Sequence, residues 1–187
     1  MAEPLHMLTA LGHAEPETRA IGSCRIVERF DVALASVAIR RGKGAAFEKA
    51  AKAAGIPLPA AARAETGTPY GAFWVAPEMW MVEAPFASHE DIVALLKPAF
   101  AEAASITEQT DAWVRFDLSA PDLRPLMEKL SNLDFAAAPD GMASRTVIEH
   151  IGCYLIRRSA DEVTIYGARS SAASLLHCLE VTAASLG

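Results

Sequence analysis

The chain has 187 residues, of which 52% are hydrophobic and 21% are charged, and its formal net charge is −6. This composition is typical of compact globular proteins and excludes a disordered chain. Its basic runs, Arg40-Arg41 and Arg157-Arg158, are only two residues long, so the electrostatic footprint of a nucleic-acid-binding protein is missing. The sequence shows neither a membrane span nor a signal peptide, and we expect a cytoplasmic protein.

The start of the chain differs in composition from the rest. Residues 1–24 carry prolines, glycines and scattered charges with few apolar positions, which predicts an N-terminal arm without a core of its own. Residues 25–187 are predicted to form a single α+β domain, with a first half at about 25–110 and a second half at about 111–187. The first strand is expected at about 32–40, where a near-continuous apolar run suits a strand that is covered on both faces.

A helix and a hairpin are predicted next. Apolar residues recur at helical spacing around Phe47, and Gly55 suits the left-handed position just past the end of that helix. Residues 70–85 predict two strands at the centre of a sheet, because aromatic and β-branched residues flank Pro77, which has no N–H to give to a ladder. Trp74 and Trp80 are expected to be core residues, since indoles bury large areas.

The middle of the chain predicts a helix and two strands. Ser88 and Asp91 have the spacing of a capping box, which places a helix start near residue 88. Pro98 should kink this helix or stop it near Lys97, because an interior proline costs about 3 kcal/mol. Alternating stretches at 104–110 and 113–118 then favour strands.

The last third predicts two helices around three strands. Ser119 and Asp122 repeat the capping spacing before an amphipathic helix formed by Leu123, Leu126, Met127 and Leu130. Asn132 is expected in the left-handed position that ends this helix. Strands are expected at about 144–151, 153–158 and 162–168, with bends at Gly152 and Asp161. The final helix spans roughly 171–186 and should face inward with Leu175, Leu176, Leu179 and Ala183.

The predicted order is β-α-β-β-α-β followed by β-α-β-β-β-α. The first half has the order of a ferredoxin-like split βαβ unit, and the second half is a variation on it. The fold class is therefore α+β, with antiparallel sheets that are covered by helices in two interlocked ferredoxin-like halves.

Known catalytic motifs are missing from the sequence. It contains no glycine-rich dinucleotide or phosphate loop and no nucleophile elbow. Its five histidines are scattered without metal-ligand spacing; they are His6, His13, His89, His150 and His177. Cys24, Cys153 and Cys178 have no Cys-x-x-Cys partner and are expected to be buried free thiols.

Other candidate residues have structural explanations. Ser170-Ser171 is explained by capping of the last helix. Glu149 and His150 are predicted to be neighbours on a strand, so their side chains should point to opposite faces and share no site. Asp111 and Asp117 have no obvious partner. We therefore predict no catalytic, cofactor-binding or metal-binding residue on this chain.

The predicted hairpin also carries a family resemblance. Residues 74–82 resemble the Trp-x-Gly-Pro-Asp/Glu-x-Trp-Leu-Leu/Val segment of the gamma subunit of heterotetrameric sarcosine oxidases. Similar segments follow in the same order over about residues 30–186, at Thr110–Asp122, Leu126–Phe135, the strand run to Arg157-Arg158, Asp161–Val163 and Ala168–Ser170. Ala76 stands where the family commonly has glycine, Ser131-Asn132 replaces its Gly-Cys pair, and the link at Asp161–Val163 is shorter than usual.

The resemblance implies a subunit of a sarcosine oxidase complex. Such a complex oxidatively demethylates sarcosine, yields glycine and hydrogen peroxide, and transfers the one-carbon unit to tetrahydrofolate. The alpha, beta and delta subunits would carry the flavins, NAD, tetrahydrofolate and zinc, and this chain would carry none of them. The gamma chain is similar in fold to the folate-binding domain of the glycine-cleavage T-protein and would be a non-catalytic structural subunit.

Two alternatives remain open. The first is a stand-alone folate-binding protein of the T-protein-like fold, which needs a concave pocket and a carboxylate for the pterin ring, with Asp117 or Asp111 as the candidates. The second is an independent enzyme, for which the sequence offers no positive feature. As an isolated subunit, the chain should expose an apolar patch larger than a monomer normally tolerates and should tend to self-associate.

Overall fold

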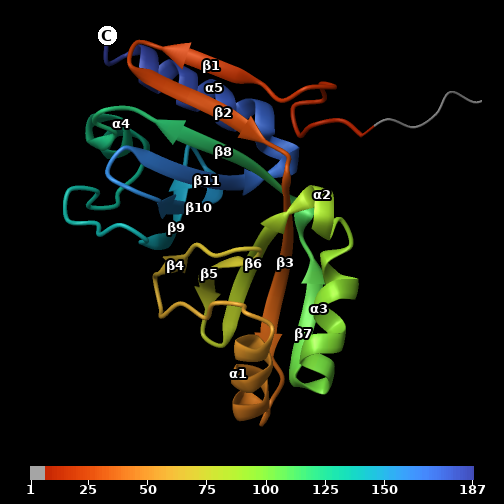
Figure 1. Cartoon of the computed structure of the whole chain (residues 1–187). Helices are drawn as coiled ribbons and strands as arrows, with labels where there is room; N and C mark the ends of the chain where they lie inside the picture. Colours follow the sequence, from red (N-terminus) through yellow and green to blue (C-terminus); the bar gives the residue numbers. More distant parts are fainter. Residues whose placement is uncertain (1–6) are drawn as a thin grey trace, which may run out of the picture. The chain divides into compact units, whose positions relative to one another are not determined.

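The computed structural model describes residues 7–187, which form two compact units with one sheet each (Figure 1). Unit 1 takes the chain up to Phe30 together with Ala112–Ala138 and Thr146–Gly187. Unit 2 takes Asp31–Asp111 and Pro139–Arg145. Both ends of the described chain therefore belong to unit 1.

Unit 2 contains a five-stranded sheet in the order β4-β5-β6-β3-β7. Its strands are β3 (Val32–Ile39), β4 (Ala64–Glu65), β5 (Gly71–Ala76), β6 (Met79–Pro85) and β7 (Ala104–Glu108). Its helices are α1 (Gly44–Ala53), α2 (Phe86–His89) and α3 (Ile92–Phe100), with short 3₁₀ turns η1 (Ala101–Ala103) and η2 (Thr110–Ala112) after them. The predicted first strand is confirmed, and the interior of β3 is buried as expected.

The hairpin β5–β6 lies inside the sheet of unit 2, as the sequence predicts. The chain turns at Pro77-Glu78, and Glu78 takes the left-handed backbone conformation with a φ of 59°. Trp74 pairs with Trp80 across the hairpin, and both indoles are half-buried. The Trp80 indole packs against the core and donates its Nε1 hydrogen to the carbonyl oxygen of Pro59 at 2.8 Å.

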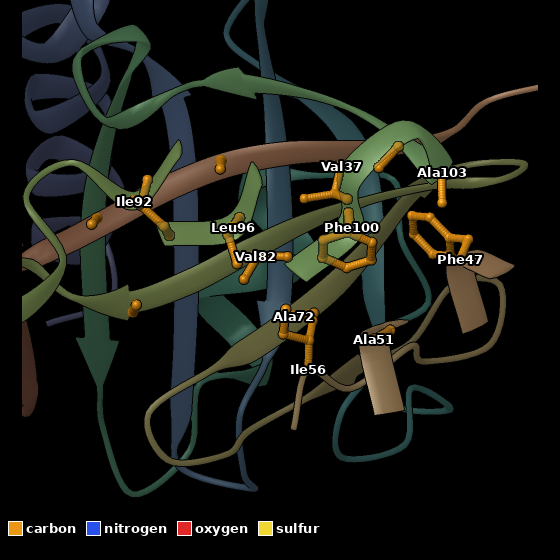
Figure 2. Close-up of a cluster of buried hydrophobic side chains, with 14 residues drawn as sticks. Val37, Phe47, Ala51, Ile56, Ala72, Val82, Ile92, Leu96, Phe100 and Ala103 are labelled. Atoms are coloured by element: carbon orange, nitrogen blue, oxygen red, sulfur yellow. The ribbon is translucent and has the colours of Figure 1, made fainter. Parts of the chain in front are cut away.

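The core of unit 2 is apolar and partly aromatic. Helices α1 and α3 contact each other, and α3 contacts β3 and β7, so that their buried side chains meet those of the sheet (Figure 2). Phe47, fully buried on α1, stacks on Trp80 with ring centroids 5.6 Å apart and lies 4.9 Å from the ring of Phe100. This cluster joins both helices to β6.

Two helix boundaries in unit 2 differ from the predictions. The cap of α3 is Asp91, whose carboxylate accepts a hydrogen bond from the Ala94 N–H at 3.0 Å, so the predicted start at Ser88 is wrong. Of the two outcomes predicted for Pro98, the stop near Lys97 is wrong, because α3 continues to Phe100, and the kink stays a prediction. By contrast, Gly55 follows α1 with a φ of +67°, which confirms the left-handed position.

Unit 1 contains a six-stranded sheet in the order β1-β2-β8-β11-β10-β9. Its strands are β1 (Thr18–Ile21), β2 (Cys24–Arg29), β8 (Trp113–Ser119), β9 (Ala143–Ile148), β10 (Ile151–Arg157) and β11 (Glu162–Ala168). The first three residues of β9 belong to the segment assigned to unit 2. Its helices are α4 (Arg124–Leu130) and α5 (Ala172–Ala184), the latter preceded by η3 (Arg169–Ser171). The sequence did not predict β1 and β2, and β1 lies within residues 1–24, where an arm was expected.

The second half of the chain confirms most of the predicted elements and corrects their ends. Helix α4 begins at Arg124 and ends at Leu130, and the next residue, Ser131, is extended, so the predicted left-handed stop at Asn132 is wrong. The bend between β9 and β10 lies at Glu149-His150, whereas Gly152 lies inside β10. Helix α5 buries its four predicted inward residues.

The α+β class is confirmed, with antiparallel sheets and covering helices in both units. In unit 1, α5 contacts β1 and β11 (Figure 1). Within residues 7–187, no helix is both long enough and apolar enough to cross a membrane.

Candidate functional site

The unit 1 sheet carries polar side chains on one of its two faces. Along β8, Val114, Phe116 and Leu118 are buried on one face. Because side chains alternate along a strand, Arg115 and Asp117 lie on the other face. The antiparallel register with β11 places Thr164 opposite Asp117 and Tyr166 opposite Arg115 on this second face.

Asp117, one of the two carboxylates named from the sequence, lies at the centre of these groups. The Arg115 guanidinium forms a bidentate pair with it, with Nε to Oδ1 at 2.8 Å and Nη2 to Oδ2 at 2.9 Å. The Thr164 hydroxyl donates to Oδ1 at 2.7 Å. Arg29 Nη1, on β2, lies 3.8 Å from Oδ2. The Asp117 side chain is 27% exposed, so these donors replace most of its hydration.

The cluster extends further along β11. Arg158 Nε donates to the Thr164 hydroxyl at 3.1 Å, and Arg115 Nη1 donates to the Tyr166 hydroxyl at 3.3 Å. The Arg115 guanidinium also lies over the Tyr166 ring, 5.7 Å from its centroid. We call this group the Asp117 cluster; its members are Arg29, Arg115, Asp117, Arg158, Thr164 and Tyr166.

The chemistry of the Asp117 cluster is that of a structural ion-pair network. The carboxylate accepts charged and hydroxyl donors from its own strand and from the neighbouring strand, which ties β8 to β11. Arg115 and Thr164 take both acceptor sites of Oδ1 and one site of Oδ2, so little acceptor capacity remains for a ligand. Asp111, the other candidate carboxylate, belongs to unit 2, where it lies exposed in η2.

A separate pocket of about 210 Å³ lies elsewhere in unit 1. Its wall is formed by the β1–β2 turn, the start of α4 and the end of α5; among the lining residues are Ile21, Cys24, Asp122, Leu126 and Ala183. The volume is comparable with cavities that hold one small apolar molecule. Neither Asp111 nor Asp117 lines this pocket, so it does not combine a concave surface with either proposed pterin carboxylate.

The described histidines lie in separate places. His13 Nε2 lies 3.0 Å from the Glu17 carboxylate near the start of the chain. His89 ends α2, with its Nδ1 2.8 Å from the Ser88 hydroxyl and its ring edge-on to Tyr70. His6 lies outside the described residues. Over residues 7–187, no three His, Cys, Asp or Glu side chains converge as a metal site.

Glu149 and His150 form the turn between β9 and β10, so their predicted place on a strand is wrong. Their φ values are 45° and 70°, the left-handed conformation that two-residue hairpin turns of type I′ require. Both residues are exposed. His177, on α5, is likewise exposed. Ser171 occupies the N-cap position of α5, but its side chain makes no capping hydrogen bond, so the capping role predicted for Ser170-Ser171 is only positional.

The three cysteines are free thiols, as predicted. Cys24 and Cys153 are buried, whereas Cys178 on α5 is half-buried. Burial raises the pKa of all three thiols, to about 11 for Cys153. For Cys178 a hydrogen bond and the negative charge of Glu149 raise the pKa further. These thiols stay protonated at neutral pH, which is the opposite of an activated nucleophile.

Comparison with known proteins identifies similar folds. No protein-family model matches the sequence, and no curated protein is similar to it. The structure is similar to a chain of the heterotetrameric sarcosine oxidase from Corynebacterium sp. U-96 in complex with pyrrole 2-carboxylate. That match has a TM-score of 0.77 and 17% identity, and it covers 87% of this chain and 84% of the oxidase chain.

A second similar structure is the glycine cleavage system aminomethyltransferase T from Bartonella henselae. Its TM-score is 0.59 at 12% identity, over 81% of this chain and 44% of the aminomethyltransferase. At these identities the likeness establishes the fold alone. The chain thus has the T-protein-like fold that the sequence resemblance implied, and it spans less than half of that enzyme's length.

Proposed function

We propose that this chain is a non-catalytic structural subunit, the gamma subunit, of a cytoplasmic heterotetrameric sarcosine oxidase. The complex would oxidise sarcosine to glycine with release of hydrogen peroxide and would form methylene-tetrahydrofolate. Flavins, NAD, tetrahydrofolate and zinc would be bound by its alpha, beta and delta partner subunits. The chain would contribute shape and contact surface to that assembly.

The observation that carries this proposal is the extent of the structural match. The likeness to a chain of a heterotetrameric sarcosine oxidase covers 84% of that chain, whereas the likeness to the aminomethyltransferase covers 44%. The match therefore takes in most of one chain of that oxidase but only part of the aminomethyltransferase. The ordered segments from Trp74 to Ser170 that resemble the gamma subunit support the same conclusion independently.

Co-purification tests the proposal. The chain, tagged and expressed together with the other three candidate subunits from the same genome, should retain flavin-bearing subunits through affinity and size-exclusion steps. Sarcosine-dependent peroxide production should travel with the complex, and the chain alone should produce none. Recovery of the tagged chain without flavin subunits under all expression conditions would refute the proposal.

Some large apolar side chains are exposed, but they are scattered singly, as on ordinary monomers, and do not by themselves form the predicted patch. Met7, Leu95, Val147 and Val181 are 58%, 49%, 60% and 54% exposed. They lie before β1, on α3, on β9 and on α5, which are separate elements. We expect the isolated chain to self-associate at high concentration, which light scattering over a concentration series measures.

The likeness to the aminomethyltransferase favours a second candidate, a stand-alone folate-binding protein. The Asp117 cluster argues against it, because the Asp117 carboxylate already accepts Arg115 and Thr164. Calorimetry with tetrahydrofolate distinguishes the two candidates. Saturable binding that Asp117→Asn abolishes would establish the folate-binding function, and absence of heat at high micromolar ligand would exclude it.

A further inference from the structure

The segment before β1 is fastened to unit 1 although most of it faces solvent. We call residues 7–17 the strap. Thr9 is its one buried residue, 4% exposed, whereas Met7 and Leu8 are 58% and 48% exposed. The strap therefore gains little from apolar burial, and hydrogen bonds must hold it in place.

The first fastening is the carboxylate of Glu28 on β2. Glu28 is 2% exposed and lies on the strand face that also buries Cys24 and Ile26. Its Oε1 accepts the Leu11 N–H at 3.1 Å, and its Oε2 accepts the Glu17 N–H at 3.1 Å. The Glu28 N–H in turn donates to the Glu17 carbonyl oxygen at 2.8 Å.

The strap in turn supplies hydrogen-bond donors to the buried carboxylate of Glu28. Within the described residues 7–187, no cation forms a salt bridge with this carboxylate. A buried carboxylate needs hydrogen-bond donors or a counter-charge, and here backbone N–H groups of the strap supply the donors. Removal of the strap would leave Glu28 without them until water replaced them.

The second fastening holds the other end of the strap. Arg169 Nη2, at the start of η3, donates to the carbonyl oxygens of Leu8 at 2.8 Å and Thr9 at 3.2 Å. Between the fastenings, the strap closes a tight turn in which the Thr9 N–H donates to the His13 carbonyl at 2.9 Å. The Gly12 N–H donates back to the Thr9 carbonyl at 3.0 Å. The turn therefore connects the backbone positions that Arg169 contacts to those that Glu28 contacts.

We propose that the strap opens and closes as one unit, with Glu28 as its latch, while the rest of unit 1 stays folded. Segments that bury little apolar surface open locally at a lower free energy than the core. Because one side chain accepts from two strap positions, loss of that acceptor releases both positions together. This device is independent of the proposed function and would exist in the isolated chain.

Amide hydrogen exchange on the full chain, followed by NMR, tests the proposal. In the wild-type chain, the amides of Thr9, Leu11, Gly12 and Glu17 should report one common opening equilibrium, more populated than that of Phe116 and Ile165 in the core. Glu28→Gln keeps one acceptor but turns an NH₂ group toward the other backbone N–H. It should accelerate exchange at all four strap amides by at least tenfold and leave the core amides unchanged.

Glu15→Gln is the matched control. Glu15 lies exposed within the strap, so the substitution removes the same charge without touching the latch. It should change strap exchange less than twofold. The proposal is overturned if Glu28→Gln leaves strap exchange unchanged, if it accelerates only Leu11 and Glu17, or if core amides accelerate equally.

A variant at Arg169 tests whether the two groups of contacts open together or independently of each other. Arg169→Gln removes the donor to Leu8 and Thr9 and leaves Glu28 intact. If the strap moves as one unit, Leu11 and Glu17 should exchange faster as well, by a factor similar to that of Thr9. Acceleration confined to Thr9 and its turn would overturn the proposal, even if Glu28→Gln behaved as expected.

Discussion

The two units stabilise their sheets by different means. Unit 2 covers β3 and β6 with helices whose buried residues are almost all apolar, and Phe47 joins α1, α3 and β6 in one aromatic cluster. Unit 1 has an apolar core as well, but its sheet also carries the charged Asp117 cluster and the buried carboxylate of Glu28. Unit 2 also buries one carboxylate, Glu83 on β6, so the comparison is between its aromatic cluster and the Asp117 cluster. Loss of a side chain should leave a cavity in the aromatic cluster and an uncompensated charge in the Asp117 cluster.

The largest effect is expected in unit 2. Phe47→Ala removes a fully buried ring that contacts Trp80 and Phe100, and the site is too well packed to collapse. The free energy of unfolding should fall by about 3–5 kcal/mol, which denaturant titration measures. Leu95→Ala, at a half-exposed position on α3, is the control and should cost less than about 1 kcal/mol. Similar losses for the two variants would contradict the assigned core.

The next effect is expected in unit 1. Asp117→Asn keeps the shape of the side chain but removes the charge that pairs with Arg115, a guanidinium that is 16% exposed. The free energy of unfolding should fall by about 1–3 kcal/mol, and the loss should persist at high salt because the pair is partly buried.

An exposed ion pair provides the comparison for Asp117. Glu128→Gln removes the partner of Arg124 on α4, where both side chains are about half exposed or more. It should leave the free energy of unfolding unchanged within error, since exposed pairs contribute little. Equal effects of the two substitutions would show that the Asp117 cluster is no more than a surface network.

The smallest effect at neutral pH concerns Cys153. Burial raises the pKa of this thiol from 9.0 to about 11. Its contribution to stability is therefore fully present below pH 9, and it is lost as the pH rises toward 11, because only the unfolded chain releases the proton in that range. The share of Cys153 in this fall should approach about 1.4 kcal/mol per pH unit. Cys153→Ala should remove that share and leave the smaller shares of Cys24 and Cys178. A wild-type curve that is flat between pH 9 and 11 would contradict this assignment.

Unit 2 was the more predictable unit because its signals are local. Pro77 between two aromatic runs marks the β5–β6 hairpin, and Gly55 marks the end of α1 without reference to distant residues. Its errors are local too: Ser88 has the spacing of a cap, but Asp91 is the residue whose side chain meets a free N–H.

Unit 1 was less predictable because its strands depend on distant partners. β2 ends at Arg29 but pairs with β8, which begins only at Trp113. Its charged residue Glu28 points inward, so the apolar–polar alternation that begins at Cys24 cannot be recognised in the sequence. The turn at Glu149-His150 has neither the glycine nor the asparagine that normally signals two left-handed residues.

Only part of the candidate site could be predicted from the sequence. Asp117 could be named, and its partner Arg115 was available from the spacing, since residues two apart on a strand share a face. Thr164 and Arg29 could not be found, because only the sheet register brings them beside Asp117. The roles of Glu28 and Arg169 also depend on contacts that no local pattern indicates.

The order of the strands along the chain has a consequence for synthesis on the ribosome. β2 ends at Arg29, but its sheet neighbour β8 begins only at Trp113, and most of unit 2 is translated in between. During that interval β2 can pair with β1 on one side, but its edge that later meets β8 has no partner on the nascent chain. A holding chaperone that shields this short stretch would keep the early chain from aggregating until β8 emerges.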